Sequence, residues 1–285
     1  MVTRTLRYRI CDVFTDRPLA GNALAVFTDA DGLSTATLQA LAREMNLSET
    51  AFVLRSTDDA ADARIRIFTP TMELPFAGHP TLGSAFVLAM PLSNEEIRLE
   101  TGRGIVRVRL TREDGRITFG WMTQPLPRLE PYTASTELLA ALGVAGSSLP
   151  IELYDNGPHY VFVELGTPEE VAALRPDLGR LAALGSTAFS IFARTGDRWK
   201  CRVFAPGEGI NEDPGTGAAA GPMAVHLARH GRIRFGDEVV IDQGVEIGRP
   251  STLHARAVGS PERLERVEVG GSAVIIGRGE LTLPA

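Results

Sequence analysis

The sequence has no long apolar stretch and no block of basic residues. No apolar run reaches the roughly 18 residues of a membrane helix, and the N-terminal segment lacks an apolar core of signal-peptide length. The net charge is −6, and arginine and lysine are scattered rather than clustered. Such a charge pattern disfavours nucleic acid and anionic membranes as partners. We therefore expect a soluble cytoplasmic protein that binds neither nucleic acid nor a membrane.

Cysteine is scarce, which excludes a disulfide framework. The only two cysteines are Cys11 and Cys201, and both lie in strand-like runs. A lone pair of this kind favours a reducing compartment. Neither thiol stands at a predicted helix N-terminus, where it would be activated, and no serine nucleophile elbow is present. Covalent catalysis and acid–base work by a pair of thiols are both disfavoured.

Nucleotide and metal motifs are incomplete. The glycines at 207–209 and 215–217 form neither Gly-x-Gly-x-x-Gly nor a Walker sequence, and backbone N–H groups there are better suited to a small anion such as a carboxylate.

His226 and His230 are four residues apart, which suits a metal on one helix face. However, no third ligand is near in sequence, and His230 is typical of a helix C-terminus. We expect no cofactor and no metal.

A proline-rich segment divides the chain. The segment 124–131 (QPLPRLEP) carries three prolines and is typical of a linker. It predicts one domain over residues 1–124 and a second over residues 132–285, whose last strand can pack on the first domain.

Two similar stretches predict an internal duplication. Arg66-Ile-Phe-Thr-Pro and Arg202-Val-Phe-Ala-Pro share one frame, and each leads to a turn, with His79-Pro in the first copy and Asp213-Pro in the second. Both copies then continue as Pro-x-x-Gly-(Ser/Ala)-Ala into an apolar segment. Two strand–turn–helix units indicate a duplicated fold. If the halves face each other, His79 and Asp213 meet across a cleft.

The remaining pattern predicts many strands around two buried helices. Residues 81–90 are apolar almost all round, which is typical of a buried helix, and the small residues 217–221 open a second helix that continues over 223–230. The fold class we expect is α+β.

Glu49 is the best candidate for moving a proton between two carbon atoms. It stands where a predicted helix and turn give way to the strand-like run 50–54, with apolar neighbours that suit an acid–base carboxylate. The alternative is a surface glutamate that caps a turn. His79 and Asp213 likewise have an alternative role as helix N-caps.

These residues resemble the PhzF family of isomerases. The resemblance rests on Asn46-Leu-Ser-Glu49, the stretch 66–80 and Glu212-Asp-Pro-x-Thr-Gly217, while 226–231 and 243–251 are similar to its phenazine branch. It covers essentially the whole chain. It implies a diaminopimelate-epimerase-like fold of two similar domains, each an antiparallel barrel-like sheet around a central helix, and a homodimer that needs no cofactor or metal.

The resemblance also implies residue roles. Glu49 would remove the C3 proton of dihydrohydroxyanthranilate and deliver a proton to C1, while His79 and Asp213 would hold the substrate and assist proton transfer. The substrate would further contact Ser48, Gly78, Thr216, Gly217 and Ala218.

One position departs from the family pattern. The family usually has Thr-Gly-Ser-Ala where this chain has Thr216-Gly-Ala218-Ala. Losing a hydrogen bond to a charged group costs about 1.5–3 kcal/mol, so we expect weaker binding, replacement by water or by the Thr216 hydroxyl, or another substrate. Two alternatives therefore stay open: an isomerase or epimerase of another small amino or hydroxy acid, and a non-catalytic binding member of the fold.

Overall fold

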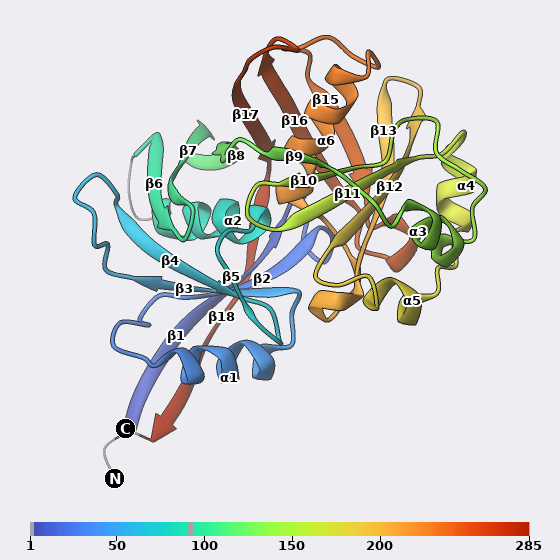
Figure 1. Cartoon of the computed structure of the whole chain (residues 1–285). Helices are drawn as coiled ribbons and strands as arrows, with labels where there is room; N and C mark the ends of the chain where they lie inside the picture. The colour runs from blue at the N-terminus through green and yellow to red at the C-terminus, as the bar shows by residue number, and fades with distance from the viewer. Residues whose placement is uncertain (1–2, 91–93, 285) are drawn as a thin grey trace. The chain divides into compact units, whose positions relative to one another are not determined.

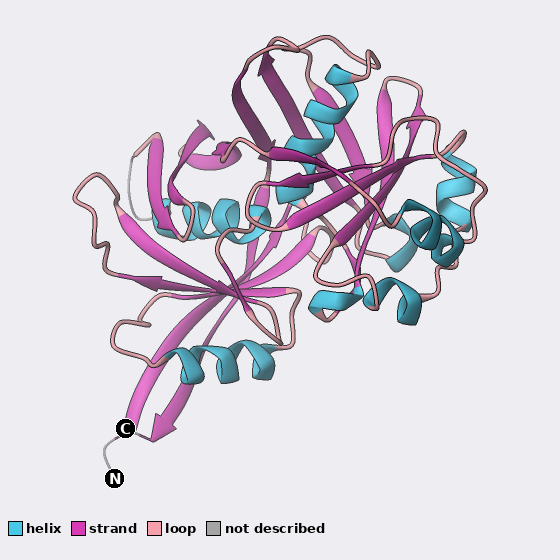
Figure 2. Cartoon of the chain, viewed as in Figure 1, coloured by secondary structure: helices cyan, strands magenta, loops and turns pink. Residues whose placement is uncertain are grey.

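The structure is a computed structural model that describes residues 3–90 and 94–284. The chain divides into two units. Unit 1 comprises residues 1–122 and 271–285, and unit 2 comprises residues 123–270. Strands dominate both units, with a few short helices (Figures 1 and 2). Among the described residues, no helix combines the length and apolar composition that a membrane crossing requires.

The strands of unit 1 pair in the order β18-β1-β2-β3-β4-β6-β7-β8, with β5 added on β4. Their bounds are β1 (Thr3–Val13), β2 (Asn22–Phe27), β3 (Glu49–Leu54), β4 (Ala63–Phe68), β5 (Glu73–Leu74), β6 (Glu96–Thr101), β7 (Gly104–Glu113), β8 (Arg116–Gln124) and β18 (Ala273–Pro284). The last strand of the chain, β18, thus pairs with the first.

The strands of unit 2 repeat this order as β9-β10-β11-β12-β13-β15-β16-β17, with β14 added on β13. Their bounds are β9 (Arg128–Pro131), β10 (Glu152–Asp155), β11 (His159–Glu164), β12 (Ala188–Thr195), β13 (Arg198–Ala205), β14 (Ile210–Asp213), β15 (Val239–Gln243), β16 (Ser251–Gly259) and β17 (Leu264–Gly271). The matching strand orders confirm two similar α+β units.

The sheets are mixed rather than purely antiparallel. Most neighbouring strands run antiparallel, but β2–β3 and β4–β6 are parallel in unit 1, as are β11–β12 and β13–β15 in unit 2. Parallel neighbours need a long crossover connection, usually a helix. In each unit the central helix forms one such crossover: α2 (Gly78–Ala89) joins β4 to β6, and α6 (Gly217–Arg229) joins β13 to β15.

Helix α2 is the core of unit 1. It is buried along nearly its whole length and contacts β1, β2, β3, β4, β6, β7 and β18. Gly83 lets β1 and β2 approach, since a Cβ there would lie 2.6–3.1 Å from the side chains of Leu24, Val13 and Cys11. The predicted buried helix is confirmed and begins three residues earlier than expected, at Gly78.

Helix α6 occupies the corresponding place in unit 2 and contains a proline. Pro222 lacks the N–H that would donate to the carbonyl of Ala218, four residues back. The side chain of Asn156 replaces this donor, with its Nδ2 2.9 Å from the Ala218 oxygen. The helix therefore tolerates the proline in its second turn.

Shorter helices cover the outer faces. Helix α1 (Thr35–Met45) has the predicted N-cap Ser34, whose Oγ accepts from the Thr37 N–H, and it ends at Asn46 in the left-handed conformation. The remaining helices are α3 (Ser135–Leu142), α4 (Pro168–Ala173), α5 (Leu178–Ala182) and the 3-10 turns η1 (Pro206–Glu208) and η2 (Val245–Ile247).

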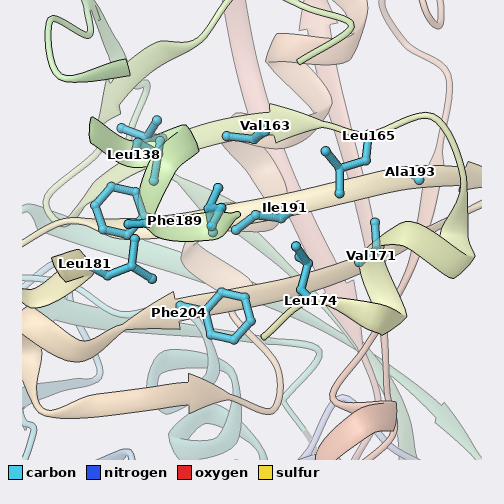
Figure 3. Close-up of a cluster of buried hydrophobic side chains, with 13 residues drawn as sticks. Leu138, Val163, Leu165, Val171, Leu174, Leu181, Phe189, Ile191, Ala193 and Phe204 are labelled. Atoms are coloured by element: carbon cyan, nitrogen blue, oxygen red, sulfur yellow. The ribbon is translucent and has the colours of Figure 1, made fainter. Parts of the chain in front are cut away.

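An apolar cluster joins α3, α4 and α5 to the sheet of unit 2 (Figure 3). The strands contribute β-branched and aromatic residues and the helices contribute leucines, as expected for a sheet covered by amphipathic helices. The labelled members are Leu138, Val163, Leu165, Val171, Leu174, Leu181, Phe189, Ile191, Ala193 and Phe204.

Candidate functional site

The repeated arginines explain the shared sequence frame. Arg66 of β4 binds the Glu73 carboxylate of β5 through two N–H···O bonds of 2.7 and 2.6 Å. Arg202 of β13 binds Glu212 of β14 in the same bidentate way, at 2.9 and 2.8 Å. Each guanidinium also lies over the phenylalanine two positions further on, 5.1 and 5.0 Å from the ring centroid. In both units the arginine fixes the short strand that leads into the turn before the central helix.

Unit 1 brings Glu49 and His79 together. Glu49 is the first residue of β3 and His79 the second residue of α2, and the distance from Glu49 Oε2 to His79 Nδ1 is 3.4 Å. The residues are only 7 % and 2 % exposed, respectively. Glu49 is therefore not a surface residue, and the N-cap of α2 is Ala77 rather than His79. These observations exclude Glu49 as a surface residue that caps a turn and His79 as the N-cap of α2.

The His79 imidazole is electrically neutral around pH 7. Burial lowers its pKa to about 3, against the smaller opposing effect of a hydrogen bond with the Ala23 backbone. Its Nδ1 also lies 3.3 Å from the Asn22 amide nitrogen. Its Nε2 is buried and has no hydrogen-bond partner among the described residues. Since buried polar atoms are nearly always paired, this nitrogen is suited to contact a ligand.

In unit 2, Asp213 ends β14 and is 4 % exposed. The hydroxyl of Thr216 donates to its Oδ2 at 2.5 Å. Thr216 is the N-cap residue of α6, and its own side chain makes no capping hydrogen bond. The alternative of Asp213 as an N-cap is thus wrong. Because the Thr216 hydroxyl donates to Asp213, we do not expect it to replace the serine hydroxyl missing at Ala218.

Gln243 of β15 fixes this turn, a role that sequence reasoning missed. Its Nε2 donates to the Asp213 carbonyl at 2.7 Å and to Thr216 Oγ1 at 2.9 Å, while its Oε1 accepts from the Thr216 N–H at 3.1 Å. In the sequence, Gln243 begins the stretch 243–251 that is similar to the phenazine branch, and the glycine that follows it is the local signal. Gly244 has φ +75°, and a Cβ there would collide with the carbonyl oxygen of Pro214.

Two further buried amides hold the start of α6. Gln124 Nε2 donates to the Gly217 carbonyl at 2.8 Å, and Asn156 donates to that of Ala218 as described above. Gly221 leaves room for Gln124, since a Cβ there would collide with the glutamine Oε1. Gln124 thus supports the helix opening as well as beginning the predicted linker.

Glu208 is a second carboxylate near Asp213 that the sequence did not single out. It lies in η1, between β13 and β14, and is 7 % exposed. Burial and the neighbouring charge of Asp213 raise its pKa to about 6. The turn therefore holds two acidic groups in a poorly solvated place.

The other predicted residues lie beside these groups. Ser48 is half-buried directly before β3, and Gly78 is the buried first residue of α2. Gly217 and Ala218 are the buried first residues of α6. Backbone N–H groups at such helix starts can bind a carboxylate.

The cysteines are free and buried. Burial raises the pKa of Cys201 to about 12 and that of Cys11 still further. Neither thiol is therefore available as a thiolate near neutral pH.

Two repeated units, each built around a buried central helix, define the diaminopimelate-epimerase-like fold. A solved hydroxyproline epimerase from Agrobacterium vitis shares the fold, with a TM-score of 0.69 at 15% identity over 98% of this chain and 92% of that one. The family model described as phenazine biosynthesis-like protein (PhzC-PhzF) matches residues 11–279, and the chain belongs to this PhzF family.

Two members of this family illustrate the similarity. The chain is 49% identical over 276 residues to the trans-2,3-dihydro-3-hydroxyanthranilate isomerase of Pseudomonas chlororaphis, covering 97% of this chain and 99% of the relative. A solved PhzF-family phenazine biosynthesis protein from Bacillus anthracis superposes with a TM-score of 0.82 at 25% identity, covering 98% of this chain and 99% of the other. The predicted family and fold are confirmed.

Proposed function

We propose that this protein is an isomerase of phenazine biosynthesis that moves a proton from C3 to C1 of trans-2,3-dihydro-3-hydroxyanthranilate. The observation that carries the proposal is the 49% identity, over 97% of the chain, to an isomerase named for this substrate. The buried pair of Glu49 and His79 supports it, since the reaction needs a carboxylate that accepts and returns a proton.

Glu49 is the proposed proton carrier. Its carboxylate removes the C3 proton, and the electron pair of the broken C–H bond enters the conjugated system of the ring. The resulting Glu49 carboxylic acid then gives a proton to C1, which forms an enol that tautomerises to an aminoketone. The small exposure of Glu49 limits exchange of the carried proton with bulk water.

His79 and Asp213 are proposed to bind and orient the substrate. Neutral His79 offers its buried Nε2 for a hydrogen bond to a substrate polar group. Asp213, oriented through Thr216 and Gln243, offers a carboxylate to the amino or hydroxyl substituent. Ser48 and the backbone at Gly78 are proposed further contacts.

The substrate carboxylate is assigned to the start of α6. The backbone N–H groups of Gly217 and Ala218 are in the first turn, where the helix dipole favours an anion. Because Ala218 has no hydroxyl, the proposal expects weaker carboxylate binding than the family serine would give.

The test is incubation with trans-2,3-dihydro-3-hydroxyanthranilate in D₂O, following the diene absorbance and the ring protons by NMR. We expect the diene to disappear with wild-type protein and kcat to fall about 10²–10⁴-fold in Glu49→Gln, which keeps the size of the side chain but removes its basicity. Glu44→Gln, at an exposed position of α1, is the matched control and should keep full activity.

Each outcome has a separate meaning. Unchanged substrate with wild-type protein would overturn the phenazine assignment. Full turnover in Glu49→Gln would overturn only the role of the glutamate. Full turnover in Asp213→Asn would remove Asp213 from the mechanism while leaving Glu49 in place.

Ala218 supports a second candidate, an isomerase or epimerase of another small amino or hydroxy acid. In this case dihydrohydroxyanthranilate stays unchanged, while another acid exchanges its α-hydrogen for deuterium in wild-type protein and not in Glu49→Gln.

We also propose a cytoplasmic homodimer, because the family resemblance implies a dimer and both cysteines are free. Light scattering on the eluted protein should give twice the mass of one chain, and a single-chain mass would contradict the dimer.

A further inference from the structure

Unit 2 contains a second cluster of polar side chains at the opposite end of α6 from the Asp213 turn. His226 and His230 come from the last turns of α6, and Glu152 from the start of β10. Glu152 Oε2 lies 3.4 Å from His226 Nδ1 and 2.9 Å from His230 Nε2. The sequence offered the histidine pair without a third ligand, and the fold supplies one from a distant strand.

We propose that Glu152, His226 and His230 bind one Zn²⁺ ion. Two imidazole nitrogens and one carboxylate oxygen are a ligand set that zinc prefers. The three ligand atoms all lie within 4.8 Å of one another. A tetrahedral zinc with bonds of about 2.0–2.2 Å separates its ligand atoms by roughly 3.4 Å. The distance from Glu152 to His226 matches this value, and the distance to His230 is about half an ångström shorter.

Arg229 pairs with the Glu152 carboxylate. Its Nη1 lies 3.1 Å from Glu152 Oε2 and supplies a positive charge to the carboxylate. The arginine side chain is 33% exposed, so it can turn outward when a divalent ion replaces it. The side chains of His230 and Glu152 are also partly exposed, at 19% and 23%.

The Tyr154 hydroxyl can keep a hydrogen bond with Glu152 when His226 binds the ion. This hydroxyl lies 3.0 Å from His226 Nδ1 and 3.1 Å from Glu152 Oε2. When the ion takes the Nδ1 lone pair, the hydroxyl keeps an acceptor in Glu152. The ring of Phe162 stacks on His226 with centroids 5.4 Å apart, which fixes the imidazole orientation.

The site would connect β10 to the C-terminal end of α6, and it does not depend on the proposed isomerase activity. The test uses the full chain after removal of metal with a chelator. We titrate it with Co²⁺, followed by visible absorption, and with Zn²⁺, followed by calorimetry. One ion should bind per chain, and Zn²⁺ should raise the melting temperature.

Variants then locate the ion. Glu152→Gln and His230→Ala should weaken binding at least about tenfold, since even outer-sphere changes commonly cost that much. Arg229→Ala should tighten binding, because it removes the competing cation. The matched control is His254→Ala: His254 pairs with Glu238 at 2.8 Å outside the cluster, and its loss should leave binding unchanged.

The proposal is overturned if wild-type protein shows no saturable binding of either ion. It is also overturned if binding survives unchanged in both Glu152→Gln and His230→Ala, or is lost in His254→Ala. His226→Ala is left out because removing a fully buried ring would itself destabilise the fold. Circular dichroism of each variant verifies that it is folded.

Discussion

The two units share one strand order but hold their candidate site residues differently. In unit 1, Glu49 and His79 face each other directly, and the His79 Nε2 has no partner among the described residues. In unit 2, Asp213 is held through Thr216 and Gln243, whose polar atoms bond to each other and to the turn backbone. The first arrangement leaves polar atoms available for chemistry, while the second fixes the position of one carboxylate.

The same contrast holds for the repeated arginines. The side chains of Arg66 and Glu73 are 17% and 38% exposed, whereas those of Arg202 and Glu212 are 6% and 11% exposed. Arg202 Nη1 also lies 2.9–3.3 Å from three backbone carbonyls at the end of α4. The repeated contact is thus a buried network in unit 2 and a more exposed ion pair in unit 1.

The largest expected effect separates these two arginines. Arg202→Met should lower the free energy of unfolding by about 3–5 kcal/mol, because it leaves Glu212 as a buried charge without its partner. Arg66→Met should cost at most about 1 kcal/mol, as is usual for an exposed ion pair. Urea denaturation of both variants gives the difference directly. Equal losses would show that the two contacts are energetically equivalent.

Gln243→Leu should remove the hydrogen bonds that hold the Asp213 turn of unit 2. It leaves the Thr216 N–H and the Asp213 carbonyl without their partner, which should cost up to about 3 kcal/mol of stability. If Gln243 also positions Asp213, the variant should lose kcat with little change in KM. A purely structural role predicts lower stability with unchanged kcat at temperatures where the protein is folded.

Glu208→Gln should stabilise the protein at pH 7. The folded-state pKa of about 6 lies above the ordinary value of 4.5, so the native state disfavours the ionised carboxyl, and stability is lost as the pH rises through this range. The gain should be about 2 kcal/mol at pH 7 and disappear below about pH 4.5. Denaturant curves at pH 7 and pH 4 measure it. A gain that is independent of pH would contradict this cause.

The smallest effect is expected from Ala218→Ser. The added hydroxyl can donate to a substrate carboxylate at the start of α6, which should lower KM by about tenfold for a bond worth roughly 1.5 kcal/mol. Ala219→Ser, one position further along the helix, is the control and should not lower KM. An unchanged KM in Ala218→Ser would show that the carboxylate binds elsewhere.

The sequence predicted the features that depend on local pattern. The repeated frame indicated the duplication, the continuous apolar segment indicated α2, and the turn motifs indicated Glu49, His79 and Asp213 as candidates. Their assigned roles stay proposals, but the burial of all three excludes the simplest surface alternatives.

The supporting residues could not be predicted because their partners are distant in sequence. Gln243, Gln124 and Asn156 each bond to the segment 213–218 from another strand or loop, and no local pattern marks a glutamine or asparagine for such a task. The parallel strand pairs escaped prediction for the same reason, since pairing direction depends on the path of the whole chain. The small residues 217–221 predicted where α6 opens. The donor that makes this opening compatible with Pro222 is Asn156, which is distant in sequence.

Pro222 also affects the order of folding. A helix normally forms its first turns from local hydrogen bonds, but the opening of α6 depends on donors from Gln124 and Asn156, more than sixty residues earlier in the chain. Closing such long loops comes before these bonds can form, which places the opening of α6 among the last events of folding in unit 2. The turn proposed to receive the substrate carboxylate should therefore form only after the segments that carry Gln124 and Asn156 are in place.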